Sequence, residues 1–264
     1  MRIGIIGATG WLGSALGGRL LAQGIVRPDQ LVVANRSGAR ATYHGHSVKW
    51  AQDCAELVGL SDVVVVSVRP DDWPALQLHA TDKLVLSFMA GIGADRLAGC
   101  GGRIVRAMPN AAAEIGRSWT PWWADDGVTA EDRHAVTTIL SAIGTSDELG
   151  AEAQMDLMTA LPGSGAAYPA LMAIAMAEFM TGQGVPEGIA WRATEAAVCG
   201  GAAMLAGRIA DAPALVAAYR DYRGTTAAGI EAAEAAEAAG FSKAIKDALL
   251  AATEKARALA VRPE

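Results

Sequence analysis

The sequence predicts an α/β protein whose N-terminal part is built on a parallel β-sheet and whose C-terminal part is entirely helical. Short, continuous apolar runs alternate with helical patterns as far as residue 150, which is typical of a parallel sheet covered on both faces. Beyond that point alanine, leucine and methionine dominate and β-branched runs vanish. We therefore expect one domain over residues 1–150 and a helical domain over residues 151–264.

Individual elements follow from the spacing of apolar residues and from the turns between them. The expected strands of the sheet are 3–6, 30–34, 62–68, 84–88 and 103–107, with one or two edge strands in 118–124. The helices expected to alternate with them begin after residue 10 and cover 53–60, 72–78, 94–98 and 131–143. The helices expected beyond residue 150 cover 151–182, 186–207, 213–220, 227–239 and 242–260.

A glycine-rich turn joins the first strand to the first helix. Its sequence is Gly7-Ala8-Thr9-Gly10-Trp11-Leu12-Gly13. The unpaired backbone amides and the dipole of the following helix favour an anion here, and a dinucleotide pyrophosphate fits this point. One extra residue separates Gly7 from Gly10, whereas Gly10 and Gly13 keep the spacing of a Rossmann-type fingerprint. The predicted cofactor contacts of this turn are Gly7, Thr9, Gly10, Trp11, Leu12 and Gly13.

The end of the second strand predicts which dinucleotide is bound. An NAD enzyme usually places a carboxylate there, but this chain has Asn35-Arg36-Ser37. The planar guanidinium of Arg36, with Asn35 and Ser37 beside it, suits a 2′-phosphate, so we predict NADP(H) in preference to NAD(H). The alternative is a glycine turn in an unrelated sheet, with Arg36 simply solvated.

Further candidates follow the later strands, because ligands of such sheets bind beyond the strand C-termini. Three short segments lie at that edge, and we assign them to cofactor binding: Val68-Arg69-Pro70, Ala90-Gly91 and Met108-Pro109-Asn110. Two glycine-containing segments in the second half precede helices and resemble anion sites suited to a carboxylate: 161–165 and 223–226. The alternative for these two is an ordinary helix N-cap by Ser164 or Thr225.

Composition excludes several classes of function. The 264 residues carry a net charge of −6 and no basic stripe, which argues against a binder of nucleic acid or anionic membranes. The three cysteines are far apart and form no CxxC pair, so neither a disulfide framework nor a zinc knuckle is indicated, and we predict a cytoplasmic protein. His44 and His46 have no third ligand nearby, so no metal is assigned. The apolar run Ala166–Met180 is too short for a membrane span and predicts a buried helix covered by a partner subunit.

Taken together, these motifs resemble the pyrroline-5-carboxylate reductase family in order and spacing along nearly the whole chain. The strongest part of the resemblance is the pair formed by Thr159–Tyr168 and Gly224-Thr225-Thr226. It implies an NAD(P)H-dependent reductase of a cyclic imine that carries a carboxylate, with a Rossmann domain and a helical domain that interlocks with a second subunit as a homodimer or a multiple of dimers.

Roles for single residues come from the same resemblance. It implies that Thr226 hydrogen-bonds the ring nitrogen and that Ser164 belongs to the catalytic site, with Met108-Pro109-Asn110 lining the nicotinamide and Ala90-Gly91 beside it. A C=N bond accepts hydride well when its nitrogen is protonated or hydrogen-bonded, so no strong side-chain base is required. The residues that it places around the substrate are Gly163, Gly165, Asp221, Arg223, Gly224 and Thr225.

The substrate segments depart from the family pattern. Asp221-Tyr222-Arg223-Gly224 stands where Ser-Pro-Gly-Gly is usual, and Pro162, Ala166 and Ala111-Ala112 also differ. These changes suggest a related imine or a changed ring. Two other classes stay open: an NADP(H)-binding sensor without turnover, and a β-hydroxyacid dehydrogenase-like oxidoreductase. The latter is weakened because residues 151–242 contain no lysine, and no tyrosine is followed four residues later by the lysine of short-chain dehydrogenases.

Overall fold

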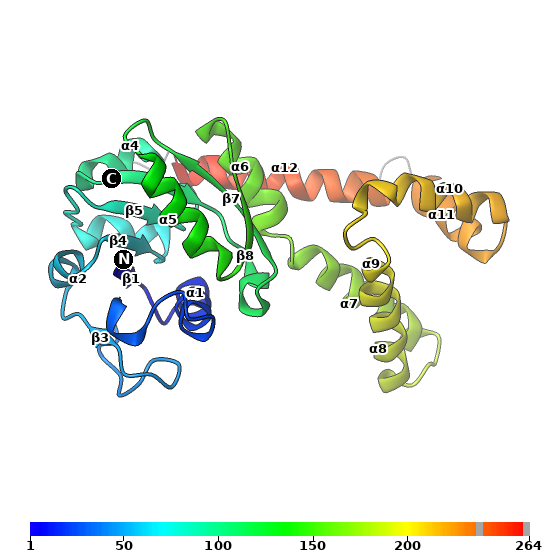
Figure 1. Ribbon diagram of the computed structural model, residues 1–264. Coiled ribbons are helices and arrows are strands. Elements are labelled where there is room, and N and C mark those ends of the chain that lie inside the picture. Colours follow the sequence, from blue (N-terminus) through cyan, green and yellow to red (C-terminus); the bar gives the residue numbers. More distant parts are fainter. Residues whose placement is uncertain (236–239, 261–264) are drawn as a thin grey trace. The chain divides into compact units, whose positions relative to one another are not determined.

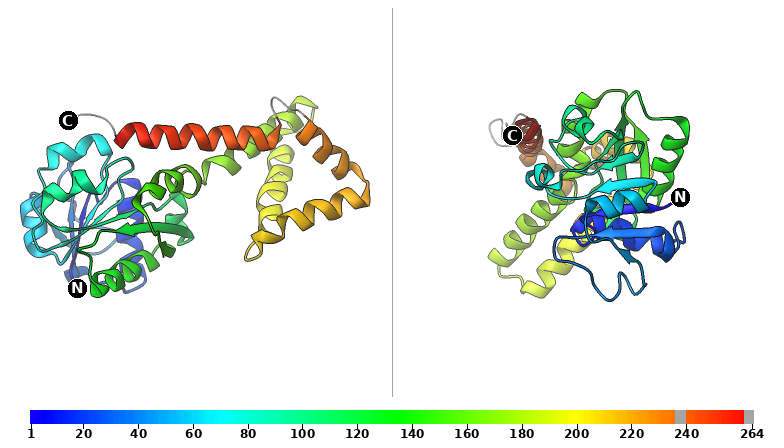
Figure 2. Two further views of the ribbon diagram at one scale, coloured as in Figure 1. Left: turned by 90° about the horizontal axis from the view of Figure 1, so that it is seen from above. Right: turned by 90° about the vertical axis from the view of Figure 1, so that its left-hand side faces the viewer.

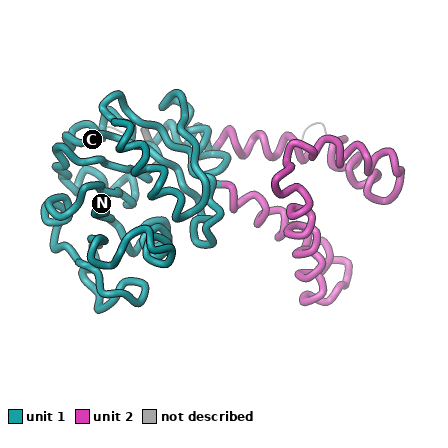
Figure 3. Tube along the Cα trace, in the orientation of Figure 1, with its two compact units in different colours: residues 1–164, 252–264 teal, residues 165–251 magenta. Residues whose placement is uncertain are grey.

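The computed structural model describes residues 1–235 and 240–260 of the chain. It contains two compact units (Figure 3): unit 1 consists of Met1–Ser164 and Ala252–Glu264, and unit 2 of Gly165–Ala251. The boundary expected at residue 150 falls within unit 1, so the domain limits stay a prediction.

Unit 1 contains an eight-stranded sheet with the order β3-β2-β1-β4-β5-β6-β7-β8 (Figure 1). Strands β1 to β6 are parallel wherever they pair, and Ile6 at the end of β1 lies opposite both Ala34 and Val66. Their C-terminal ends therefore meet at one edge, and the predicted α/β class is confirmed. The strands are β1 Ile3–Ile6, β2 Leu31–Ala34, β3 Lys49–Trp50, β4 Val63–Val66, β5 Leu84–Ser87, β6 Arg103–Ala107, β7 Ser118–Ala124 and β8 Gly144–Glu148.

The sheet differs from the expectation at its two sides. Strand β7 pairs antiparallel with β6 and is not an edge strand, because β8 pairs parallel with its other side. Neither β8 nor β3 was predicted. The sequence of β8, Gly-Thr-Ser-Asp-Glu, is polar and half-exposed, and β3 is only two residues long, so neither carries the apolar signal of a strand.

Helices cover both faces of the sheet (Figure 2), as the continuous apolar strands predict. On one face, α1 (Trp11–Ala22) and α5 (Ala130–Ser141) pack in the cluster that contains Ile3 and Ile5. On the other, α2 (Cys54–Leu60), α3 (Trp73–Leu76) and α4 (Ala94–Leu97) pack in the cluster that contains Ile6. Successive strand residues point to opposite faces, which divides the core into these two layers.

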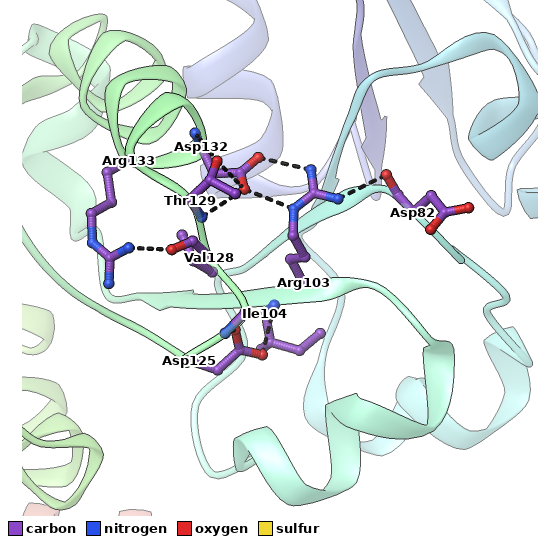
Figure 4. Close-up of polar contacts among 9 residues, drawn as sticks. Asp82, Arg103, Ile104, Asp125, Val128, Thr129, Asp132 and Arg133 are labelled. Carbon is purple, nitrogen blue, oxygen red and sulfur yellow. Dashed lines mark hydrogen bonds and ion pairs between the residues drawn. The ribbon is translucent and has the colours of Figure 1, made fainter.

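An ion pair joins α5 to strand β6 (Figure 4). The Nε and Nη2 atoms of Arg103 donate to the two carboxylate oxygens of Asp132 over 2.7 and 2.8 Å. Asp132 also accepts from the backbone amide of Thr129 at 2.9 Å, while the Thr129 hydroxyl accepts from the Asp132 amide at 3.1 Å. This reciprocal capping box fixes the start of α5. The hydrogen bonds from Arg103 lower the pKa of Asp132 to about 2.

Beyond residue 150 all the described secondary-structure elements are helices, as predicted. The helix expected over 227–239 begins earlier, at Thr225, and positions 236–239 lie outside the described residues. The helix expected over 186–207 includes a π-helical turn at Ala196–Gly200, and its last helical residue is Ala203. The helices are α6 Met155–Met158, α7 Ala167–Gly182, α8 Glu187–Glu195, α9 Gly201–Ala203, α10 Ala212–Tyr222, α11 Thr225–Ala235 and α12 Phe241–Ala260.

Helix α7 was expected to be buried, but in a single chain only Ala177 of its residues is buried, and Leu171 and Phe179 are 63% and 66% exposed. The apolar run Ala166–Met180 is part of a longer helical segment, and a single such segment is weak evidence of a membrane span. It lies within a helical segment of 31 residues, Glu152–Gly182, that is long and apolar enough by composition to cross a membrane. A surface of this kind needs a cover, whether lipid or protein.

Candidate functional site

The glycine turn after β1 is built by close contacts between backbones. Gly7 has a φ of +82°, and a Cβ atom there would lie 2.2 Å from the carbonyl oxygen of Ser67 at the end of β4. The amides of Gly7 and Ala8 donate to the carbonyl of Ala34 over 3.0 and 3.2 Å. Only glycine meets both requirements at position 7, so the turn lies against the ends of the two strands that flank β1.

Helix α1 begins directly beyond this turn, at Trp11. Gly10 occupies its N-cap and supplies no side chain that would occupy the first amides of the helix. A Cβ atom at Gly13 would lie 2.5 Å from the carbonyl oxygen of Gly7, so the helix sits tightly on the turn. The amides of Trp11 and Leu12 have no carbonyl partner within the helix and are available to an anion.

A cavity of about 540 Å³ opens beside this turn. It is bounded by the ends of β1, β2 and β4, which is the edge where a dinucleotide binds in a sheet of this class. The structure thus brings together six of the predicted cofactor residues: Gly7, Gly10, Asn35, Arg36, Val68 and Arg69.

Two arginines converge on one carboxylate in the wall of this cavity. Arg36 Nη1 lies 3.3 Å from Asp72 Oδ1, and Arg69 Nε lies 3.4 Å from Asp72 Oδ2. The Arg36 side chain is 81% exposed, so it is free to turn towards a ligand. Two guanidinium groups within reach of one anionic group are an arrangement that also suits a phosphate. Asp72 was not predicted from the sequence, although it follows Arg69-Pro70 closely in the chain.

Other predicted cofactor residues lie outside this cavity. Thr9 and Trp11 line a neighbouring cavity of about 590 Å³ on the other side of Gly10, and Trp11 is 66% exposed. The hydroxyl of Ser37 accepts from the Asn35 side chain instead of lining the cavity. Leu12 packs against the core and Pro70 opens a short 3₁₀ turn. Contacts of these residues with a cofactor stay predictions.

The segment after β6 connects two of the predicted motifs. Asn110 Nδ2 donates to the carbonyl oxygen of Pro162 over 2.9 Å, and Asn110 Oδ1 accepts from the amide of Ala112 at 3.0 Å. Met108 is 5% exposed, and a Cβ atom at Gly163 would lie 3.2 Å from its Cγ atom. The predicted nicotinamide segment and the start of the predicted substrate loop are therefore neighbours within unit 1.

The segment 159–165 interrupts the α-helical region, as expected, and α7 begins after a turn at residues 164–166. Thr159–Gly163 forms a π-helical turn, and the Ser164 hydroxyl donates to the carbonyl of Thr159 over 3.0 Å. Ser164 is the C-cap of this π-helical turn and not the N-cap of α7, which is Ala166 and makes no side-chain cap bond. The alternative interpretation of Ser164 as an ordinary N-cap is therefore wrong. π-Helical turns are frequent at functional sites.

Gly91 has a structural role that its sequence context did not indicate. Its φ is +70°, and a Cβ atom there would lie 2.3 Å from the Cβ of Leu259, near the end of α12. Gly91 is buried, and Ala90 beside it is half-buried. A glycine is required here for the packing of α12, and a contact of Ala90 or Gly91 with the nicotinamide stays a prediction.

The remaining predicted substrate residues belong to unit 2. Arg223 ends α10 with a left-handed φ of +53°, and the Gly224 carbonyl accepts from the Ala227 amide at 3.1 Å. Helix α11 begins at Thr225, so the N-cap position falls on Gly224 and the interpretation of Thr225 as that cap is wrong. Thr225 and Thr226 are both exposed. Asp221 is exposed too, and Gly165 is the first residue of the unit. The described residues contain no group of three metal-ligating side chains.

Comparison with known proteins decides the family. A family model described as pyrroline-5-carboxylate reductase dimerisation matches residues 152–259, and one described as NADP oxidoreductase, coenzyme F420-dependent, matches residues 2–91. The pyrroline-5-carboxylate reductase of Pseudomonas aeruginosa is 33% identical over 270 residues, which cover 98% of this chain and 97% of that protein. The chain belongs to the pyrroline-5-carboxylate reductase family.

Solved structures of pyrroline-5-carboxylate reductases share this fold. The enzyme from Coxiella burnetii has a TM-score of 0.85 and 27% identity, with 99% of each chain covered. The enzyme from Plasmodium falciparum, solved with NADP bound, has a TM-score of 0.84 and 22% identity, with 98% of each chain covered. The helical region 152–259 corresponds to the dimerisation region of the pyrroline-5-carboxylate reductase family, and it includes α7 with its exposed apolar residues.

Proposed function

We propose that this protein reduces the C=N bond of pyrroline-5-carboxylate, or of a closely related cyclic imino acid, with NADPH. The observation that carries the proposal is the full-length similarity to pyrroline-5-carboxylate reductases, the P. aeruginosa enzyme among them. The cavity beside the glycine turn supports the proposal independently. It lies at the sheet edge where a dinucleotide binds, and Arg36 and Arg69 beside it suit the 2′-phosphate of NADP.

The residues present fit NADP(H). Gly7 brings the turn against the strand ends without a side chain, and the amides of Trp11 and Leu12 open towards the position of a pyrophosphate. Arg36 and Arg69, which pair with Asp72 in the structure, are placed to bind a 2′-phosphate instead of that carboxylate. NADPH, when bound, supplies the hydride for the reaction.

The chain's own residues are proposed to orient and polarise the imine. Thr226 donates a hydrogen bond to the imine nitrogen, which makes the neighbouring carbon a better hydride acceptor. Ser164 is proposed to contact the substrate, and the backbone groups of Gly163–Gly165 and those of Gly224–Thr225 are each proposed to suit a carboxylate. Arg223 offsets the negative charge that Asp221 would present to that carboxylate. Orientation of the imine carbon supplies much of the rate acceleration.

We propose that the protein forms a homodimer, or a multiple of dimers, through its helical region. Leu171 and Phe179 of α7 are exposed in the single chain, and a partner subunit would bury them. Sedimentation of the double variant Leu171→Glu, Phe179→Glu is expected to give monomers where the wild type gives dimers. Wild-type protein that sediments as a monomer at micromolar concentration would contradict the proposal. A cytoplasmic location stays a prediction.

The function is tested by following NADPH absorbance with purified protein and a panel of cyclic imines. The panel contains pyrroline-5-carboxylate, its six-membered imino acid analogue, and a five-membered imine without the carboxylate. We expect NADPH consumption with at least one imino acid and much slower consumption with the imine that lacks a carboxylate. Binding of NADPH without consumption across the whole panel would contradict the enzyme and favour an NADP(H) sensor, an alternative prompted by Asp221-Tyr222-Arg223.

A further inference from the structure

The connection between β2 and β3 contains a tight hairpin at Tyr43–His46. Tyr43 and His46 exchange two backbone hydrogen bonds of 2.9 and 3.0 Å. The two residues between them, His44 and Gly45, both have positive φ, at +49° and +80°. This is the pattern of a type I′ turn, which holds the two flanking residues side by side. The hairpin therefore fixes the backbone position of Tyr43.

Tyr43 reaches from this hairpin into the glycine turn. Its side chain is buried, with the residue only 4% exposed, and its hydroxyl lies 2.9 Å from the carbonyl oxygen of Ala8 and 3.1 Å from that of Gly13. These two carbonyls lie on either side of Thr9–Leu12, the segment whose amides open towards the pyrophosphate position. One phenol donor thus spans both ends of the turn. Burial raises the pKa of Tyr43, so the hydroxyl remains a donor at any working pH.

Helix α1 is shaped to receive the hairpin. A Cβ atom at Gly17 would lie 2.2 Å from the Tyr43 hydroxyl oxygen, and one at Gly18 would lie 2.8 Å from Cε1 of His44. On the preceding turn of α1, Ser14 Oγ lies 3.1 Å from His44 Nε2. The adjacent glycines are thus explained by the approach of the two rings, and the hairpin contacts both the turn and the helix that follows it.

We propose that Tyr43 is a positioning residue for the pyrophosphate-binding turn, and that its hydroxyl holds the backbone of Ala8–Gly13 in the conformation that binds the dinucleotide. The proposal rests on the proposed binding of NADP(H) at this turn. The hydroxyl acts on the pyrophosphate segment and not on Arg36, the proposed 2′-phosphate reader. Loss of the hydroxyl should therefore weaken the binding of NADPH and of NADH to the same degree.

The test compares Tyr43→Phe with a matched control, Ser61→Ala. Both substitutions remove a hydroxyl of a buried residue that donates to a backbone carbonyl in unit 1, because Ser61 Oγ donates to Leu57 O over 2.7 Å. We expect Tyr43→Phe to raise the dissociation constants of NADPH and NADH by the same factor of about three to ten, measured by nucleotide fluorescence. KM for both nucleotides should rise likewise with kcat within about twofold, and Ser61→Ala should leave these constants unchanged.

A second readout needs no nucleotide. Hydrogen exchange of the free protein should show the amides of residues 9–13 exchanging several-fold faster in Tyr43→Phe than in the wild type or in Ser61→Ala. Unchanged exchange in this segment, or unchanged nucleotide binding by Tyr43→Phe, would overturn the inference. An effect confined to NADPH would also overturn it, since it would place the role of Tyr43 at the 2′-phosphate. Wild-type protein that binds neither nucleotide would contradict the proposed function itself, and the inference with it.

Discussion

The side-chain amide of Asn110 donates a hydrogen bond of 2.9 Å to the carbonyl oxygen of Pro162. This bond joins the segment after β6, which is predicted to line the nicotinamide, to the π-helical turn that precedes Ser164. Because Asn110 Oδ1 also accepts from Ala112, both ends of the side chain are engaged within the protein. Asn110 therefore acts on the position of its neighbours and is less available as a direct ligand of the cofactor.

Asn110→Ala should lower kcat/KM for the imine by about ten- to a hundredfold, because a small displacement of the substrate loop is costly in a reaction that depends on orientation. The dissociation constant of NADPH should change by less than about twofold. Gln23→Ala is the matched control, since Gln23 Nε2 also donates to a carbonyl in unit 1, that of Ala142, at 3.0 Å. A large loss of NADPH affinity in Asn110→Ala would show instead that its side chain contacts the cofactor.

Arg36→Ala should raise the KM of NADPH by about ten- to a hundredfold and that of NADH only slightly, because only NADPH carries the 2′-phosphate that the guanidinium is placed to bind. Steady-state kinetics with both nucleotides check this. Arg27→Ala serves as the control, because Arg27 forms a comparable exposed pair with Asp29, outside the cavity. Equal changes for the two nucleotides would remove Arg36 as the phosphate reader.

Asp72→Asn should increase the preference of the protein for NADPH over NADH. In the structure Asp72 pairs with both Arg36 and Arg69, and its negative charge would repel a phosphate bound between them. Removing the charge is expected to lower the KM of NADPH by a few fold, with a smaller change for NADH. The difference should shrink at high salt because the two arginines are exposed. An increase in the KM of NADPH would mean that Asp72 is needed to orient the arginines.

Stability at acid pH should depend on Asp132. Its pKa is lowered from 3.8 to about 2 by the hydrogen bonds from Arg103, so its contribution of about 2 kcal/mol to the free energy of unfolding is complete above pH 4. It is lost as the pH falls from 4 towards 2, where the folded protein also takes up the proton. Asp132→Asn should therefore show a smaller loss of stability over this interval in urea unfolding, while Asp29→Asn, in an exposed pair, should match the wild type. Identical acid dependence of all three proteins would contradict this assignment.

Most of the sheet and the glycine turn could be predicted from sequence because their signals are local. The run Val63–Val66 is apolar throughout since both of its faces are buried, and Gly7 and Gly13 are spaced by a turn that has to pack against its own strand. The helical structure beyond residue 150 could likewise be predicted from the composition of that region. The antiparallel direction of β7 was not, because strand direction depends on the connection, and the polar β8 carried no apolar pattern.

The parts of the candidate site that were missed depend on contacts distant in sequence. Tyr43 lies 35 and 30 residues from the carbonyls to which it donates, and a lone tyrosine in a polar loop gives no sign of them. Asp72 appeared as an ordinary helix-start carboxylate until Arg36 was found beside it. Gly91 was assigned to the cofactor from its place after a strand and from the family resemblance, whereas its packing against Leu259 could be seen only in the folded chain.

The central claim, that this chain transfers hydride from NADPH to a cyclic imine, is tested most directly by isotope transfer. The protein is incubated with pyrroline-5-carboxylate and NADPH that carries deuterium at C4, in separate reactions for the two faces of the ring, and the product is analysed by mass spectrometry. We predict that one of the two labelled forms gives a product that is one mass unit heavier. The other form should give a product without deuterium. Absence of deuterium in the product from both forms, with NADPH bound to the protein, would contradict the account.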